Sequence, residues 1–451
     1  MTTANPRPRP GSGSRPGSRP RGVAHLLGPL VAAFLNGVLP VRLRAWDGSE
    51  IGPNDAPRVT VRDRDALRHV LARPGELGLS RAYVTGGIEV EGDLTDALRH
   101  VWASVEEYGT SVPGPRDWAR AARLALVLGV VGPPLPPPVT EARMGGRLHS
   151  KERDAAAISH HYDAGNDLYE LLLDETMAYS CALWDEGDPD QSLADAQRAK
   201  LDLICEKLRL GKGDRLLDVG CGWGSLTLHA ARWYGARVAA VTLSARQRDH
   251  VRKRAAEEGL EQLVDVRLLH YRDIEPDTFG PGLFDAAASV EMGEHVGRDA
   301  YAPFVRQLHD LIRPGGSLLV QQMSRRGAYP GGGPFIERYI APDMHMRPLG
   351  ETVGLLEEAG LEVRGVQAMR EHYVRTARAW SDVLERRFDE MVSITGPQAA
   401  RVWRLYLAGG ALAFEEGRMG VDQILAHRPG PHPDGWASRP AEQPELTEVT
   451  G

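Results

Sequence analysis

Two hydrophobic patterns alternate along the second half of the chain. Short runs that are almost wholly apolar, as in strands buried on both faces, are separated by segments in which apolar residues recur at helical spacing. The strand-like runs cover 215–219, 237–241, 264–269, 284–290 and 317–323, and helical segments include 225–233, 246–258 and 300–312. Buried strands that alternate with helices predict a doubly wound α/β domain, which we place at 151–430.

The region before this domain has shorter elements. Residues 23–108 contain strand-like runs at 59–61 and 88–90 and helical segments at 65–71 and 94–105, which predicts a small α+β domain. Residues 109–150 are interpreted as a linker. They contain an amphipathic segment at 118–128, which we expect to pack on its own protein, with contact to lipid as the alternative, and a proline run at 132–138, which favours an extended chain.

The two ends of the chain are expected to be disordered. Residues 1–22 consist largely of Pro, Gly, Ser and Arg, and 431–451 form a second polar tail. Five arginines without an acid in the first tail either keep it soluble or tether it to anionic lipid. The first apolar run, at 26–39, is shorter than the roughly 20 residues of a membrane span, so we expect a buried or interfacial helix.

Composition excludes several classes of protein. A formal net charge of −7 argues against a nucleic-acid partner. The three cysteines are too few for a disulfide framework, which favours a reducing cytoplasm. His160 and His161 are adjacent, so on a strand they would face opposite ways, and no cluster of Cys or acid completes a site. We therefore predict no metal.

A glycine-rich turn is the strongest local motif. Leu-Leu-Asp-Val-Gly-Cys-Gly-Trp-Gly at 216–224 joins a predicted strand to a predicted helix. Its glycines permit a tight bend and a close approach to a ligand, and the helix N-terminus suits a carboxylate. A dinucleotide site would have the spacing G-x-G-x-x-G and an acid after the second strand. Here the spacing is G-x-G-x-G and the second strand ends at Thr242 and Leu243, which argues against a nicotinamide enzyme.

Other motifs accompany this turn at 161–167, 177–184, 241–247, 289–297 and 335–342. Together, over about 155–428, they resemble the cyclopropane-fatty-acyl-phospholipid synthases and mycolic acid methyltransferases. The resemblance implies a Rossmann-like class I methyltransferase domain and S-adenosylmethionine as the methyl donor. The residues that it implies for cofactor binding are Tyr179, Ser180, Asp218, Gly220, Gly222, Gly224, Thr242, Leu243, Gln247, Arg272 and Asp273.

Methylation of an alkene by such enzymes has several chemical requirements. An alkene attacks a sulfonium methyl only if it is held close and in line, and the resulting carbocation must be shielded from water. A base must then remove a proton. If the new methyl loses its proton as the ring closes, a cyclopropane forms. If a hydride shifts along the chain first, an exocyclic methylene forms.

In the family that the chain resembles, the base is a bicarbonate ion held by a cysteine backbone, a glutamate, a histidine and a tyrosine. Cys181, Glu294 and Tyr373 match three of these positions, whereas Gln321 stands where histidine is expected. Glu291 stands where the cyclopropane-forming relatives usually have glycine.

Two interpretations of these departures remain open. Either Gln321 donates a hydrogen bond to bicarbonate in place of the histidine, or the base is re-tuned, with Glu291 or a shifted anion taking the proton. His295, next to Glu294, either orients that glutamate or only packs in the loop.

The pair Gln321–Gln322 and the segment 339–348 resemble actinobacterial enzymes that make 10-methylene fatty acids, the precursors of tuberculostearic acid. We therefore predict an S-adenosylmethionine-dependent methyltransferase that acts on oleoyl-type chains of membrane phospholipid, with peripheral contact at the inner face of the cell membrane. A homodimer and a partner reductase are further expectations. The alternatives are a cyclopropane synthase, a small-molecule methyltransferase and a non-catalytic lipid-binding protein.

Overall fold

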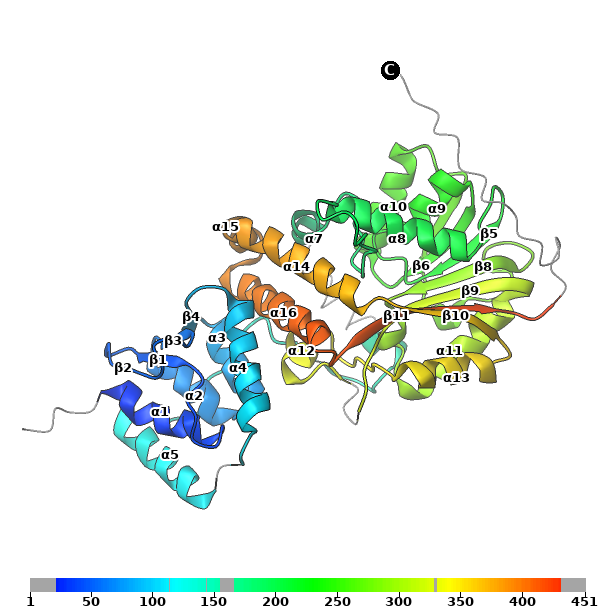
Figure 1. The fold of residues 1–451 in the computed structure, drawn as a ribbon. Helices are drawn as coiled ribbons and strands as arrows, with labels where there is room; N and C mark the ends of the chain where they lie inside the picture. Colours follow the sequence, from blue (N-terminus) through cyan, green and yellow to red (C-terminus); the bar gives the residue numbers. More distant parts are fainter. Residues whose placement is uncertain (1–21, 113, 143, 155–165, 328–330, 431–451) are drawn as a thin grey trace, which may run out of the picture. The chain divides into compact units, whose positions relative to one another are not determined.

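The computed structural model describes residues 22–112, 114–142, 144–154, 166–327 and 331–430 (Figure 1). The chain divides into two compact units. Unit 1 comprises Met1–Arg68 and Gly87–Pro134, and unit 2 comprises His69–Gly86 and Leu135–Gly451. This division differs from the predicted one, because the amphipathic segment at 118–128 belongs to unit 1 and the short stretch 69–86 belongs to unit 2.

Unit 1 is built on a four-stranded sheet of order β2-β1-β3-β4. Its strands are β1 (Arg42–Ala45), β2 (Glu50–Ile51), β3 (Arg58–Val61) and β4 (Ile88–Val90), and its helices are α1 (Val23–Ala33), α4 (Leu94–Tyr108) and α5 (Pro115–Leu128). The division between the units falls within α2 (Arg64–Ala72). Asp93 caps α4, since its side chain accepts a hydrogen bond from the backbone N–H of Asp96.

Helix α1 is shorter than the apolar run that predicted it. It ends at Ala33, and the next residues turn back, with positive φ at Asn36 and Gly37 and a hydrogen bond from Gly37 N to Ala32 O of 2.8 Å. Asparagine and glycine tolerate this left-handed conformation, so they end the helix although the apolar residues continue to position 39.

Unit 2 contains a seven-stranded sheet of order β10-β11-β9-β8-β5-β6-β7. The strands β5 (Arg215–Val219), β6 (Arg237–Thr242), β7 (Val264–Leu268), β8 (Phe284–Val290) and β9 (Ile312–Ser324) are parallel and overlap the five predicted runs, although β9 begins five residues before its predicted run. Strands β10 (Glu362–Ala368) and β11 (Gly420–His427) were not predicted, and β11 is antiparallel to both of its neighbours.

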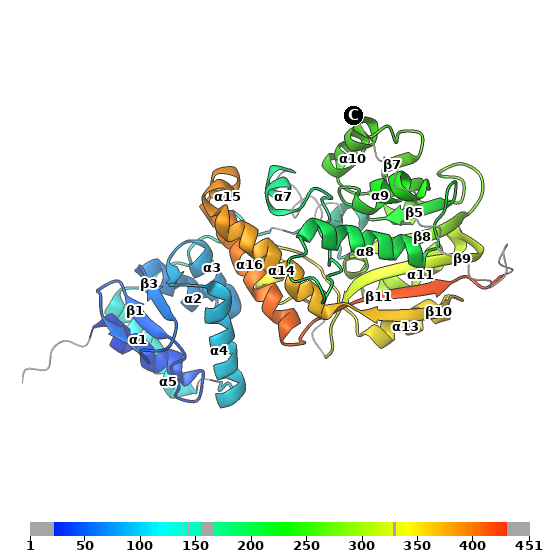
Figure 2. The ribbon, with the colours of Figure 1, turned by 45° about the horizontal axis from the view of Figure 1, so that its top comes forward.

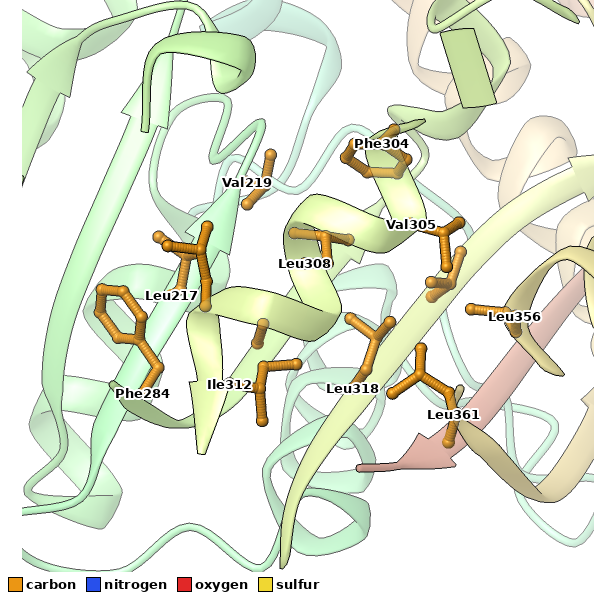
Figure 3. Close-up of a cluster of buried hydrophobic side chains, with 14 of the residues drawn as sticks. Leu217, Val219, Phe284, Phe304, Val305, Leu308, Ile312, Leu318, Leu356 and Leu361 are labelled. Atoms are coloured by element: carbon orange, nitrogen blue, oxygen red, sulfur yellow. The ribbon is translucent and has the colours of Figure 1, made fainter. Parts of the chain in front are cut away.

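Helices cover both faces of this sheet, as predicted for a doubly wound fold. Helices α8 (Leu193–Lys207), α9 (Ser225–Tyr234) and α10 (Ala245–Glu257) cover one face, and α11 (Arg298–Leu311) and α13 (Leu349–Glu358) cover the other (Figure 1). Neighbouring strand residues alternate between the faces: Leu216 joins the core under α8 and α9, whereas Leu217 joins the core under α11. Figure 3 shows the core under α11, in which Leu308 of that helix points toward the strands.

A further layer of unit 2 is helical. Helices α7 (Asn166–Leu172), α14 (Arg370–Arg386), α15 (Phe388–Thr395) and α16 (Pro397–Glu415) pack together, and α14 and α16 lie side by side (Figure 1 and Figure 2). Helix α3 (Glu76–Val84) and helix α12 (Pro334–Tyr339) pack against each other in the same unit. The carboxylate of Glu76 accepts a hydrogen bond of 3.0 Å from the backbone N–H of Phe335 and so caps α12.

Candidate active site

A cavity opens at the carboxyl ends of β5, β6 and β8, the usual place for a ligand in a doubly wound sheet. Most residues predicted to bind the cofactor line it: Tyr179, Ser180, Asp218, Gly220, Gly222, Thr242, Leu243 and Gln247. The cavity is also lined by Met177, Lys200, Trp223, His270, Tyr271, Glu291, Met292 and His295.

The glycine turn forms one wall of this cavity. Gly220 has φ of +85°, and a Cβ there would lie 2.8 Å from Cγ of Met292. Gly222 has φ of +54° and open space beside it, so its backbone faces the cavity. Gly224 does not line the cavity, because it packs on Val251 of α10. Two glycines thus shape the site, and the third allows α9 to approach α10.

The end of β6 offers an unused hydrogen-bond donor. The Thr242 hydroxyl donates to Oε1 of Gln247 at 2.7 Å, which holds the amide with its nitrogen on the other side. Within the described part of the chain, that buried nitrogen has no hydrogen-bond partner. Because buried donors are almost always paired, an acceptor of a bound ligand is expected here. This fits the cofactor ribose that the sequence resemblance places beside Gln247.

Arg272 and Asp273 do not line the cavity. Arg272 donates to the backbone carbonyl of His149 at 3.0 Å, and Asp273 forms an ion pair with Lys151. Both lie in a short 3-10 turn, Tyr271–Asp273, whose first residue reaches the cavity instead, together with His270. Position along the chain alone could not show which residue of this turn faces inward.

Charged groups lie in the cavity wall. Burial raises the pKa of Asp218 to about 6, although Thr227 donates a hydrogen bond to its carboxylate at 2.6 Å. Lys200 is fully buried and donates to the Ser180 hydroxyl at 2.8 Å. Burial lowers the pKa of Lys200, while the nearby carboxylate of Glu291 opposes that shift. Lys200 could not be recognised from the sequence, because a single lysine on an amphipathic helix usually faces solvent.

The carboxylate of Glu291 gathers three of the other predicted residues. One of its oxygens accepts hydrogen bonds from the Cys181 backbone N–H at 2.8 Å and from Nε2 of Gln321 at 2.9 Å. The second oxygen accepts from the Tyr373 hydroxyl at 2.7 Å. Burial raises the pKa of Glu291, and these three hydrogen bonds oppose that shift. Cys181 contributes only its backbone, since burial raises the pKa of its thiol well above the usual value.

Glu294 stands apart from this cluster of donors. One of its oxygens accepts a hydrogen bond from the backbone N–H of Met323, and the other is buried without a partner among the described residues. Burial, together with the negative charge of Glu291, raises the pKa of Glu294 to about 8. At neutral pH Glu294 therefore carries a proton.

His295 lines the cavity beside Glu294. Burial lowers the pKa of His295 to about 4, so its imidazole is neutral, and the nearby groups that act on it are Asp154 and His149.

An aromatic cluster adjoins the cavity on the side of the helical layer. Ring centroids lie 5.2 Å apart for Tyr179 and Trp380 and 4.3 Å apart for the stacked pair Tyr373 and Phe414. Two members, Tyr179 and Trp223, also line the cavity. The aromatic cluster consists of Tyr169, Tyr179, Trp223, Tyr373, Trp380, Trp403, Tyr406 and Phe414. Most of this cluster could not be predicted from the sequence, because α14 and α16 bring its members together from distant positions.

Among the described residues, no group of histidine, cysteine and acidic side chains is arranged to hold a metal ion. His160 and His161 lie outside the described residues. The same part of the chain contains no helix that is long and apolar enough to cross a membrane.

Comparison with known proteins gives consistent matches. The family model described as mycolic acid cyclopropane synthetase matches residues 149–424. A probable fatty acid methyltransferase of Pseudomonas putida is 38% identical over 91% of this chain and 98% of its own length. The tuberculostearic acid methyltransferase UfaA1 of Mycobacterium tuberculosis is 31% identical over 87% of this chain and 89% of its own length.

The cyclopropane-fatty-acyl-phospholipid synthase of Escherichia coli is 30% identical over 82% of this chain and 87% of its own length. Among solved structures, the mycolic acid cyclopropane synthase CmaA1 complexed with SAH and CTAB matches with a TM-score of 0.56. It is 29% identical and covers 60% of this chain and 98% of its own.

Proposed function

The chain belongs to the mycolic acid cyclopropane synthetase family and is an S-adenosylmethionine-dependent fatty acid methyltransferase, and from this premise we propose its substrate and product. It methylates the double bond of an oleoyl-type chain in a phospholipid and leaves a 10-methylene branch. The alternative product within the same family is a cyclopropane ring.

The observation that carries this proposal is the aromatic cluster beside the cofactor cavity. S-adenosylmethionine, when bound, supplies an electrophilic methyl group. An alkene that accepts this methyl becomes a carbocation, and the faces of aromatic rings attract a cation. The cluster is buried and almost free of charge, so it also keeps water from the cation and suits an acyl chain better than a polar small molecule.

The steps that lead to a methylene branch balance in charge and in bonds. Methyl transfer to one alkene carbon leaves the cation on the other. A hydride shift from the methylated carbon moves the cation to that carbon, and loss of a proton from the new methyl forms the exocyclic double bond. The name of the relative UfaA1, a tuberculostearic acid methyltransferase, supports this branched product, and the name of the Escherichia coli relative supports a phospholipid substrate.

Access to such a substrate requires contact with a bilayer, and we assign this contact to α5 in unit 1. Ala125 and Leu128 on one face of α5 are buried. Leu126 and Val127 on the outer face are each 69% exposed. A helix that mixes arginine with exposed tryptophan and aliphatic residues is typical of one lying in an anionic membrane interface. The outer residues are Arg116, Trp118, Arg120, Arg123, Leu126 and Val127.

Sedimentation with vesicles that contain anionic lipid tests this assignment. Replacement of Leu126 and Val127 by serine should weaken binding at least tenfold, with unit 1 still folded by circular dichroism. Unchanged binding would exclude α5 as the contact, and loss of a dimer in place of vesicle binding would show that a second copy covers this face instead.

The product is tested by expression in a bacterium that makes oleate but no modified lipids, followed by mass spectrometry of fatty acid methyl esters. Methylene and cyclopropane isomers have the same mass, so the remaining alkene must be derivatised. We expect the methylene product. Cyclopropane alone would reject the proposed product, and the absence of any new one-carbon product would reject the lipid substrate. Because the branch still contains an alkene, a separate reductase would be needed to saturate it.

A further inference from the structure

We propose that the carboxylate of Glu291 is itself the base of the reaction and occupies the position of the active-site anion, so that no bicarbonate takes part. This inference rests on the proposed function, since it concerns the removal of the last proton from the same carbocation.

The groups that would donate hydrogen bonds to an active-site anion already donate them to Glu291. The Cys181 backbone N–H and the Tyr373 hydroxyl each have one proton, and both protons point to the Glu291 carboxylate at 2.8 and 2.7 Å. A second anion would find neither donor free. It would also have to lie beside a buried negative charge, where repulsion is strong because little water screens it.

The third donor is held in place by a chain of hydrogen bonds. Nζ of Lys207 donates to Oε1 of Gln423 at 2.7 Å, and Nε2 of Gln423 donates to Oε1 of Gln321 at 2.9 Å. The amide nitrogen of Gln321 is therefore the end that faces Glu291. Since a lysine only donates, it fixes the orientation of both amides. Gln321 thus donates to the Glu291 carboxylate at 2.9 Å, and the same nitrogen donates to the Cys181 carbonyl at 3.4 Å.

The backbone at Glu291 also favours a functional role. Its φ is +51°, in the left-handed region, where a residue with a Cβ costs on the order of 1 kcal/mol more than glycine. Glycine would avoid that cost. Strain of this kind clusters at functional sites, which supports a functional role for the Glu291 carboxylate.

The surroundings of Glu291 and Glu294 also differ, because three hydrogen-bond donors contact the Glu291 carboxylate and oppose the rise of its pKa on burial, whereas a single backbone N–H contacts Glu294 among the described residues. Glu294 holds its proton at neutral pH, whereas the carboxylate of Glu291 is stabilised by three donors and by the nearby ammonium of Lys200. Two carboxyl groups whose surroundings separate their protonation states divide the roles of acid and base between them. Only Glu291 is then free to accept a proton.

The position of Glu291 suits the removal of a proton from the carbocation. Glu291 lines the cofactor cavity, and its partner Tyr373 belongs to the aromatic cluster. Among the described residues, one Glu291 oxygen accepts two hydrogen bonds and the other accepts one, which leaves a lone pair on the second oxygen. That oxygen takes a proton from the transferred methyl group. The electron pair of the broken C–H bond becomes the exocyclic double bond and neutralises the carbocation, and the proton leaves to water before the next turnover.

Three forms of the full-length protein test the proposal: the wild type, Glu291→Gln and Glu291→Gly. Each is assayed with vesicles of dioleoyl phosphatidylglycerol and S-adenosylmethionine, in buffer stripped of carbon dioxide and in buffer with added bicarbonate. The methylated chains are measured by mass spectrometry. Binding of S-adenosylmethionine, measured by calorimetry, shows that each variant is folded.

We expect wild-type activity to be the same in both buffers. Glu291→Gln should lose about 100-fold or more, in the range of a removed general base, and should gain nothing from bicarbonate. Glu291→Gly frees the three donors and relieves the positive φ. It should be as inactive as Glu291→Gln without bicarbonate and should recover at least tenfold when bicarbonate or formate is added.

A wild type that loses activity in stripped buffer would overturn the proposal, as would a Glu291→Gln variant with near-normal activity. A wild type that forms no methylated lipid in either buffer would instead contradict the proposed function.

Discussion

Replacing Glu294 by glutamine should stabilise the protein at neutral pH. Burial and the charge of Glu291 raise the pKa of Glu294 from 4.5 to about 8. Between these pH values the folded protein keeps the proton, whereas the unfolded chain has lost it. The unfolded state therefore gains free energy from ionisation that the folded state does not, and stability falls as pH rises from 4.5 to 8.

The size of the effect follows from the same shift. At pH 7 the difference from the ordinary pKa is about 2.5 units, each worth about 1.4 kcal/mol, so Glu294 lowers the free energy of unfolding by about 3 kcal/mol. Glutamine has the same shape, keeps an acceptor for the Met323 N–H, and has no proton to lose. Glu294→Gln should therefore gain about 3 kcal/mol at pH 7 and almost nothing at pH 4.5.

Denaturant unfolding of the wild type and the variant at pH values from 4.5 to 8.5 measures this difference. A matched control is Glu357→Gln, a change at an exposed glutamate of α13, which should leave the free energy of unfolding unchanged at each pH. A Glu294→Gln variant that is less stable than the wild type at pH 7, or whose gain in stability does not grow with pH, would contradict the raised pKa of Glu294.

Three further changes test the site. Gly220→Ala should weaken S-adenosylmethionine binding at least tenfold in calorimetry, because the new Cβ would lie 2.8 Å from Cγ of Met292 at a backbone φ of +85°. Unaltered affinity would contradict the assignment of Gly220 to the wall of the cofactor cavity. Tyr373→Phe should lower the free energy of unfolding by about 2 kcal/mol, since it leaves the buried Glu291 carboxylate with one donor fewer; a neutral change would show that the hydroxyl is not needed there. Lys207→Met should reduce the methylation rate several-fold without affecting cofactor affinity, because it removes the fixed end of the hydrogen-bond chain to Glu291; an unchanged rate would mean that the amides keep their orientation without it.

The central strands could be predicted because their residues are apolar on both faces, as in Leu216 and Leu217 of β5. Strand β11 could not, because buried polar residues interrupt its pattern: Asp422 and Gln423 are both buried. The side chain of Gln423 bonds to Gln321 of β9 and Lys207 of α8, which lie far away in the chain. No local pattern reveals such partners.

The candidate site likewise contains residues that could be assigned from the sequence and residues whose role could not. Residues on the glycine turn and at the end of β6 could be assigned because a strand, a turn and a helix fix their positions locally. Glu291 could be noted as an additional acid, but its occupation of the anion position depends on the positive φ and on donors from three other segments. The roles of Glu294 and Glu291 could not be separated from the sequence, since burial decides which of the two keeps its proton.

The place of α3 in unit 2 affects how the chain can fold during synthesis. Phe335, whose backbone Glu76 caps, follows Glu76 by 259 residues. At about 5–20 residues per second, a ribosome needs roughly 13–50 s to make that stretch. During this time Val84, which is fully buried in the finished protein against Phe335, Tyr339 and Val402, has no partner. The nascent chain therefore presents an unpaired apolar helix for tens of seconds, and a chaperone that binds it would delay the closing of unit 2 until translation is nearly complete.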